Sequence, residues 1–265
     1  MATVREIYAY LDGQAPFSLQ LGFDNAGFLV GRGDRAVTTL LVSLDITEEV
    51  VAEAVEIGAQ LIVSHHPVLF HPAKSITDRD PNGRILLALT EQKIAAICAH
   101  TNLDAVFGGV NDALAQKLGL IQVEQLKQDG VDTSGRPYGI GRVGNTSGAP
   151  MYAPAFAAFV KQTLGANGVR YVDVRRPVRR VAVGGGACAD MLQDALAMGC
   201  DTFVTSDVKY NGFLDAKALG VNLIDAGHYP TEQVVVPVLA KWLSAGFPTV
   251  TVATTQRHKE VFSYL

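Results

Sequence analysis

The chain has 265 residues, of which 48% are hydrophobic and 18% are charged, and its formal net charge is −4. The apolar content is sufficient for a sizeable core and excludes a disordered or coiled-coil chain. The slight acidic excess argues against nucleic-acid binding, which normally needs a basic surface, and no apolar run reaches the ~18 residues that cross a bilayer.

The N-terminal residues and the number of cysteines indicate in which cellular compartment the protein is expected. Three charged residues among the first twelve interrupt the apolar run that a signal peptide requires. The three cysteines are too few and too irregularly spaced for a disulfide framework or a zinc ribbon: Cys98, Cys188 and Cys200. We therefore expect a cytoplasmic protein with reduced thiols and no membrane or nucleic-acid partner.

Strands alternate with helices through the first half. A short helix is predicted at 3–12, before a turn-rich stretch at 23–34. A buried strand at 38–46 then leads to a helix at 47–59, with Thr47 as its N-cap and Gly58 at its end. A strand, a helix, a strand and a helix follow at 61–64, 82–92, 95–100 and 110–120. This alternation predicts a mostly parallel sheet covered by helices.

The middle of the chain is richer in turn residues. Residues 128–150 contain many Gly, Ser, Pro and Asn and are predicted to form turns or a hairpin, before a helix at 153–165 and a strand at 169–174.

The pattern of the first half then returns as an internal repeat. Residues 40–66 align without gaps on 181–207, so that Gly58 falls on Gly199. The following segments align at a second offset, which places His100 on His228. Repetition is also expected of any α/β protein, so its significance rests on where the polar residues fall.

Each half ends a strand with a histidine and places a carboxylate four residues later. These pairs are His100 with Asp104, and His228 with Glu232. A carboxylate near a helix N-terminus is favoured by the helix dipole. Ligands of open α/β sheets bind beyond the carboxyl ends of the strands, which is where these residues are expected.

Two adjacent histidines, His65 and His66, also follow a strand and precede Pro67. They can serve one site only if the chain leaves strand geometry there, because neighbouring side chains of a strand point to opposite faces. The inventory is then four histidines and two carboxylates. These donors suit Zn, Fe, Mn, Ni or Co, and six exceed what one tetrahedral ion needs, which favours a pair of ions per chain.

Four segments carry a resemblance to a known family: FDNAGFLVG, LIVSHHPVLF, AHTNLDAVFGGVNDALAQKLGL and DAGHYPTEQ. Together they resemble the Nif-three-like dinuclear metal family, also described as GTP cyclohydrolase I type 2 homologues, in its short form without an inserted middle domain. The resemblance implies two divalent metal ions and assigns their ligands as His65, His66, Asp104, His228 and Glu232, with Glu232 bridging. It places His100 beside the metals or as a proton carrier.

The same resemblance implies the architecture. We expect two related, interlinked α/β lobes with mostly parallel or mixed sheets and the dinuclear site between them. The first lobe is predicted at 1–126 plus 222–265 and the second at 127–221. The family assembles as a homohexamer, so a self-assembled ring is expected.

The implied activity is hydrolysis of a nucleotide, with opening of the guanine ring of GTP and loss of formate. His100 and Asp207 are the candidate proton carriers. The alternative is a non-catalytic metal-binding or regulatory scaffold, which would share the same ligands. Two positions depart from the family pattern, with Phe23 in place of Trp and Asn211 where relatives often carry His.

Weaker signals leave alternatives open. The glycine run 184–187 is predicted to be a tight strand-to-helix turn rather than a phosphate loop, because it lacks the spacing of a nucleotide motif. Asp45 is a candidate partner of a ligand histidine, and Asp207 and Lys209 are candidate substrate contacts.

Three further polar residues are interpreted without a role in the site. Asp24 is interpreted as a turn residue, His71 as a bystander and His258 as part of a solvated surface.

Overall fold

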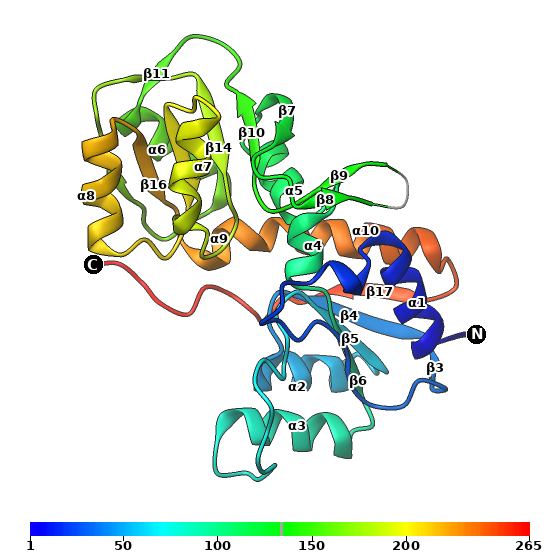
Figure 1. Ribbon diagram of the computed structural model, residues 1–265. Helices are drawn as coiled ribbons and strands as arrows, with labels where there is room; N and C mark the ends of the chain where they lie inside the picture. Colours follow the sequence, from blue (N-terminus) through cyan, green and yellow to red (C-terminus); the bar gives the residue numbers. More distant parts are fainter. Residues whose placement is uncertain (133–134) are drawn as a thin grey trace. The chain divides into compact units, whose positions relative to one another are not determined.

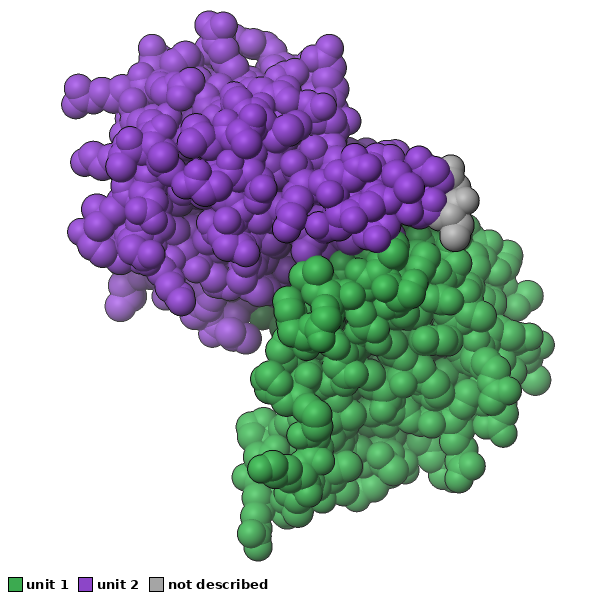
Figure 2. Space-filling model, viewed as in Figure 1, with its two compact units in different colours: residues 1–103, 235–259 green, residues 104–234, 260–265 purple. Residues whose placement is uncertain are grey.

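The computed structural model describes residues 1–132 and 135–265. It divides into two compact units, coloured separately in Figure 2. Unit 1 comprises residues 1–103 and 235–259, and unit 2 comprises 104–234 and 260–265. Residues 104–126, 222–234 and 260–265 thus belong to unit 2, whereas the sequence-based division placed them in the first lobe. The reason is strand pairing, because the strands at 121–125 and 222–225 both join the sheet of unit 2.

Unit 1 is built on a five-stranded sheet in the order β17-β4-β5-β6-β2 (Figure 1). Four strands are parallel: β17 (Thr251–Thr254), β4 (Thr39–Ser43), β5 (Leu61–Ser64) and β6 (Ala95–Cys98). The edge strand β2 (Gly27–Val30) is antiparallel to β6. The central strands β4, β5 and β6 are buried almost throughout, as expected for a parallel sheet covered on both faces.

Helices of unit 1 bury their apolar sides on this sheet. Helices α2 (Glu48–Glu56) and α3 (Pro81–Glu91) share a core with the strands through Leu41, Ile62 and Leu89. Thr47 caps α2 as predicted, accepting a hydrogen bond from the Val50 N–H. Helix α10 (Val236–Gly246) packs against β17 and β4. The remaining elements are α1 (Val4–Gln14), the 3₁₀ turn Phe17–Leu19, and the pair β1 (Ala2–Thr3) and β3 (Ala36–Val37).

Unit 2 contains a six-stranded sheet in the order β12-β16-β15-β14-β10-β7. Its parallel centre is formed by β14 (Arg180–Val183), β15 (Thr202–Thr205) and β16 (Asn222–Asp225). The flanking strands are antiparallel: β12 (Arg170–Val172), β10 (Arg142–Asn145) and β7 (Ile121–Gln125). The architecture of both units confirms the predicted α/β class with mixed sheets.

Helices cover both faces of the second sheet. Val181 and Val183 face a core with α5 (Val110–Lys117) and α6 (Ala153–Leu164), whereas Ala182 faces α7 (Leu192–Ala197) and α8 (Tyr210–Leu219). This alternation follows from the two-residue period of a strand. The smaller elements of unit 2 are α9 (His228–Glu232), the 3₁₀ turn Ala189–Met191, and the pair β11 (Met151–Tyr152) and β13 (Pro177–Val178). Helix α4 (Thr101–Ala105) and the 3₁₀ turn Gln233–Val235 each contain residues of both units.

The turn-rich middle segment forms a hairpin, as one of the two expectations had it. Strand β8 (Gly130–Val131) pairs antiparallel with β9 (Pro137–Tyr138). The segment predicted at 128–150 also includes residues 133 and 134, which lie outside the described residues.

The two repeats form the same series of strands and helices, except that the last helix of each repeat packs on the sheet of the other unit. Residues 40–66 form β4, α2 and β5, and residues 181–207 form β14, α7 and β15, with the two strands parallel in each case. The third strand is β6 in one repeat and β16 in the other. The long helix that follows it belongs to the opposite unit, so that α5 covers the sheet of unit 2 and α10 covers the sheet of unit 1.

Across the described residues, no helix combines the length and the apolar character that crossing a membrane requires.

Candidate metal centre

His65 and His66 leave β5 in a turn rather than as an extended strand. The N–H groups of both residues donate to the carbonyl oxygen of Leu44, at 3.1 Å and 2.9 Å. The two rings consequently lie near each other, with centroids 4.9 Å apart. The departure from strand geometry that one shared site requires is therefore present.

His100 joins these two residues at the end of β6. Its ring centroid lies 5.2 Å from that of His65 and 5.5 Å from that of His66. One ring nitrogen from each of the three lies within 4.8 Å of the others, a spacing compatible with shared metal coordination. His65 is fully buried, and the side chains of His66 and His100 are mostly so.

Each of the three rings is oriented through its Nδ1 atom. The Nδ1 atom of His65 lies 2.8 Å from the carbonyl oxygen of Ala99. That of His66 lies 2.7 Å from Asp45 Oδ1, and that of His100 lies 2.7 Å from Asp24 Oδ1. Because a carbonyl or carboxylate only accepts, each Nδ1 of a neutral ring carries the proton, and the lone pair lies on Nε2, the atom that can accept a proton or a metal ion.

Asp24 therefore has a larger role than the turn residue that the sequence suggested. Its carboxylate also accepts hydrogen bonds from the backbone N–H of Thr101, at 3.0 Å, and from the Thr101 hydroxyl. Burial raises the pKa of Asp24, but the hydrogen bonds from His100 and Thr101 lower it to about 2. The carboxylate remains ionised at neutral pH and holds His100 in one tautomer.

His258, interpreted from sequence as a solvated residue, is buried against Asp45. Its side chain is only 7% exposed, and its Nε2 atom lies 2.7 Å from Asp45 Oδ2. Asp45 thus contacts His66 with one oxygen and His258 with the other. Burial raises the pKa of Asp45, but these two contacts lower it well below its usual value. The contact of Asp45 with His66 agrees with the sequence-based hypothesis, whereas the interpretation of His258 was wrong.

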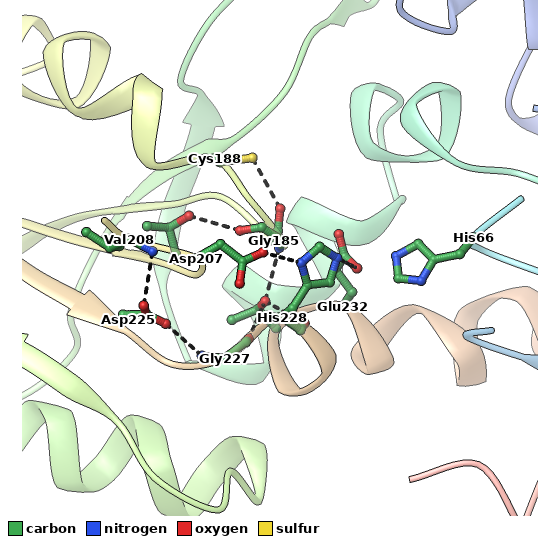
Figure 3. A network of polar contacts seen from close by, with 12 residues as sticks. His66, Gly185, Cys188, Asp207, Val208, Asp225, Gly227, His228 and Glu232 are labelled. Atoms are coloured by element: carbon green, nitrogen blue, oxygen red, sulfur yellow. Dashed lines mark hydrogen bonds and ion pairs between the residues drawn. The ribbon is translucent and has the colours of Figure 1, made fainter. Parts of the chain in front are cut away.

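Unit 2 contains the second group of candidate ligands (Figure 3). His228 opens α9, and its Nε2 atom lies 2.9 Å from Glu232 Oε2, one turn further along the helix. Its Nδ1 atom lies 2.6 Å from Asp207 Oδ2, so the same orientation through Nδ1 recurs here. The backbone of Asp207 is in the left-handed region, with φ of 53°, an uncommon conformation for a residue other than glycine.

The glycine run 184–187 packs against Glu232. A Cβ atom at Gly186 would lie 2.0 Å from Glu232 Oε1, and φ is 67° there, so both the space and the backbone require glycine. The Gly186 N–H donates to Thr231 Oγ1 and the Gly185 N–H to Asn111 Oδ1. This loop is thus a tight turn that admits a carboxylate, in agreement with the preferred sequence interpretation.

Asp104 is buried in unit 2, and Asn111 binds its backbone carbonyl at 3.0 Å. Burial raises the pKa of the Cys188 thiol well above its usual value, and the charges of Asp104 and Glu232 raise it further. Cys188 is therefore a neutral thiol beside two carboxylates. His71, Lys209 and Asn211 are exposed.

The predicted site residues thus fall into two groups, one in each unit. Unit 1 brings His65, His66 and His100 together, and unit 2 holds Asp104, His228 and Glu232. Sequence reasoning missed the roles of Asp24 and His258. The FDNAG motif was a signal for the first, whereas nothing near His258 in the sequence pointed to Asp45.

The fold and these residues define a class, namely two-unit α/β proteins with histidine and carboxylate donors at the ends of parallel strands. A model of the Duf34/NIF3 (NGG1p interacting factor 3) family matches residues 2–260. The chain belongs to this family.

Curated and solved relatives agree with that assignment. A Clostridium perfringens protein named GTP cyclohydrolase 1 type 2 homolog is 36% identical over 239 residues, covering 90% of this chain and 88% of the relative. A Bacillus cereus protein related to NIF3 superimposes with a TM-score of 0.94 at 26% identity, covering 100% of this chain and 99% of the other. A Staphylococcus aureus protein, SA1388, superimposes with a TM-score of 0.91 at 30% identity, covering 99% of each chain.

Proposed function

We propose that this protein is a dinuclear metal-dependent hydrolase that acts on a nucleotide. Its two divalent ions would be bound by the ligands that the family resemblance assigns: His65, His66, Asp104, His228 and Glu232. The names of the curated relatives support GTP as the first substrate to test. The homohexamer and the cytoplasmic location remain predictions.

The observation that carries the proposal is that four histidines are oriented in the same way, through their Nδ1 atoms. In His65, His66, His100 and His228 alike, Nδ1 lies against a carbonyl or carboxylate oxygen at 2.6–2.8 Å. Metal-binding histidines in proteins are held in this way, because the outer partner fixes the tautomer and increases the basicity of Nε2. Imidazole and carboxylate donors also match the preference of Zn, Fe, Mn, Ni and Co, so the donor set fits the metals.

Divalent ions in such a site supply Lewis acidity that activates water near neutral pH. Residues of the chain would then position the donor groups and transfer protons. Glu232 is held by the glycine loop, which fixes its carboxylate. His100 has its Nδ1 proton engaged by Asp24, so its Nε2 atom is available to accept a proton from water and return it to the leaving group.

Asp207, the second candidate proton carrier, contacts His228 instead. Its Oδ2 atom lies 2.6 Å from Nδ1 of that residue. We therefore propose that Asp207 orients His228, which leaves the proton-transfer role to His100.

The metal proposal is tested by elemental analysis of purified protein. We expect about two divalent ions per chain, and we expect the double variant His65→Ala, Glu232→Ala to lose them because it removes one donor from each group. His71→Ala is the matched control, since His71 is exposed and contributes no predicted donor. Full metal retention in the double variant would refute the ligand assignment.

Activity is tested separately, with metal-loaded protein and a nucleotide panel. We expect turnover of GTP or a related nucleotide with release of formate or phosphate, and a loss of about 10²-fold or more in His100→Ala with metal content retained. Metal binding without turnover of any nucleotide would contradict the hydrolase and support a metal-binding scaffold.

A further inference from the structure

The turn at residues 20–26 is fixed by a dense set of hydrogen bonds. The Leu21 N–H donates to Thr101 Oγ1 at 2.9 Å, and the Ala26 N–H donates to the Gln20 side chain at 2.8 Å. Within the turn, the Asp24 N–H donates to the Leu21 carbonyl at 2.9 Å. The Asp24 carboxylate binds His100 and Thr101, as described above. The backbone of this turn is thus tied to the end of β6, next to the histidine cluster.

The side chain at the apex of this rigid turn is a large aromatic ring in solvent. Phe23 is 66% exposed. Its ring centroid lies 6.3 Å from that of Phe70, which is itself 37% exposed. The turn and the loop carrying Phe70 are joined by a hydrogen bond from the Asn25 side-chain amide to the Leu69 carbonyl. The two phenylalanines therefore form a pair on two loops that are joined by a hydrogen bond.

This aromatic pair adjoins the candidate metal ligands. The Phe70 ring meets the His100 ring edge to face, with centroids 6.0 Å apart and planes at 84°. An exposed phenylalanine gains little from the hydrophobic effect, so Phe23 contributes little to the fold in this position. A preorganised ligand site combines a fixed backbone with exposed groups that can contact the ligand. Here the hydrogen-bonded turn supplies the first, and the exposed aromatic rings next to His100 supply the second.

We propose that Phe23 and Phe70 form a stacking platform for the planar base of a nucleotide. The inference rests on the proposed hydrolase and assigns the residues that would bind the base of its substrate. Every nucleobase has a π-face that stacks on an aromatic side chain, and the platform would hold that face beside His100. A ring carbon undergoing hydrolysis must lie near the group that transfers protons, and a base stacked on this pair would lie beside the His100 ring that Phe70 contacts.

The test compares ligands with and without a ring on the full metal-loaded chain. Calorimetric titration with guanosine and GTP measures ring binding, and titration with inorganic triphosphate measures phosphate binding. We expect Phe23→Ala to weaken guanosine and GTP binding by about 5- to 100-fold and leave triphosphate binding and metal content unchanged. Phe23→Trp should restore binding because it returns a π-face, whereas Phe23→Leu should not.

Phe107→Ala is the matched control, because Phe107 is 67% exposed and lies in unit 2. We expect it to bind guanosine like the unmodified chain. Equal affinity for guanosine in Phe23→Ala and the unmodified chain would overturn the platform. Rescue by Phe23→Leu would overturn stacking in favour of simple apolar contact.

Two further outcomes separate this inference from the hydrolase. If metal-loaded protein binds guanosine through Phe23 but hydrolyses no nucleotide, the platform stands and the hydrolase fails. If the chain binds none of the purine or pyrimidine nucleosides, the platform is overturned whatever the activity. A change of oligomeric mass in Phe23→Ala with unchanged guanosine affinity would instead assign this surface to contact between copies of the chain.

Discussion

Asp45 connects a residue near the end of the chain with a candidate metal ligand. One oxygen of its carboxylate contacts His66, and the other contacts His258, each at 2.7 Å. The segment carrying His258 is anchored by buried Glu53, which accepts hydrogen bonds from the Thr255 hydroxyl and the Gln256 N–H. The orientation of the His66 ring therefore depends on a segment almost two hundred residues away in sequence.

We predict that His258→Ala weakens metal binding by about 10- to 100-fold, because outer partners of ligand histidines typically contribute this much. His258→Gln should recover part of the loss, since its amide can donate to the same oxygen. Titration of metal-free protein with Co²⁺, followed by its ligand-field absorption, measures both affinity and ligand geometry. His71→Ala is the control, and an unchanged cobalt spectrum and affinity in His258→Ala would contradict the prediction.

At the scale of elements, the glycine loop between β14 and the 3₁₀ turn Ala189–Met191 is fitted to α9. A Cβ at Gly186 would lie 2.0 Å from Glu232 Oε1, and a Cβ at Gly185 would lie 2.9 Å from the Val110 side chain and 3.2 Å from the Thr231 carbonyl oxygen. The loop and the helix start are therefore matched in shape.

We predict that Gly186→Ala lowers the free energy of unfolding by about 1–3 kcal/mol and weakens metal binding, because the added Cβ displaces Glu232. Gly199→Ala is a matched control. It has a similar φ of 73°, but a Cβ there would have no neighbour within 4 Å, so it reports backbone strain alone. Denaturant unfolding and metal titration measure the two effects, and equal losses in both variants would show that the clash with Glu232 is unimportant.

At the scale of the whole molecule, the exchange of α5 and α10 makes each unit depend on both repeats. Leu239 and Leu243 of α10 are fully buried, and β17 completes the edge of the sheet of unit 1 next to β4. Unit 1 therefore cannot complete its core from the first repeat alone.

We predict that a chain ending at residue 234 loses cooperative folding of unit 1. Removing α10 takes away the burial of these two leucines, which contributes about 3–6 kcal/mol, a large share of the 5–15 kcal/mol that stabilises a typical domain. Amide hydrogen exchange should then show lost protection in β4 and retained protection in β15. A chain ending at residue 259 is the control, because it keeps α10 and β17. Protection of β4 in the shorter chain would contradict this prediction.

Much of the fold was predictable from local pattern. Thr47 and Gly58 marked the ends of α2, and runs such as LIVS marked buried strands, because capping and burial act over a few residues. The boundaries of the two units were harder to predict from the sequence. They depend on the partner with which strands such as β7 and β16 pair, and pairing partners are distant in sequence.

The sequence by itself determined the family, the α/β class and the identities of the candidate donors, since these follow from residue type, spacing and order. Only the tertiary structure decided which side chain orients which ring. Asp24 contacts His100, Asp45 contacts His66 and His258, and Asp207 contacts His228, and the partners are between 21 and 213 positions apart. A hydrogen bond depends on atomic positions within a few tenths of an ångström, and those positions are set only when the strands and helices pack.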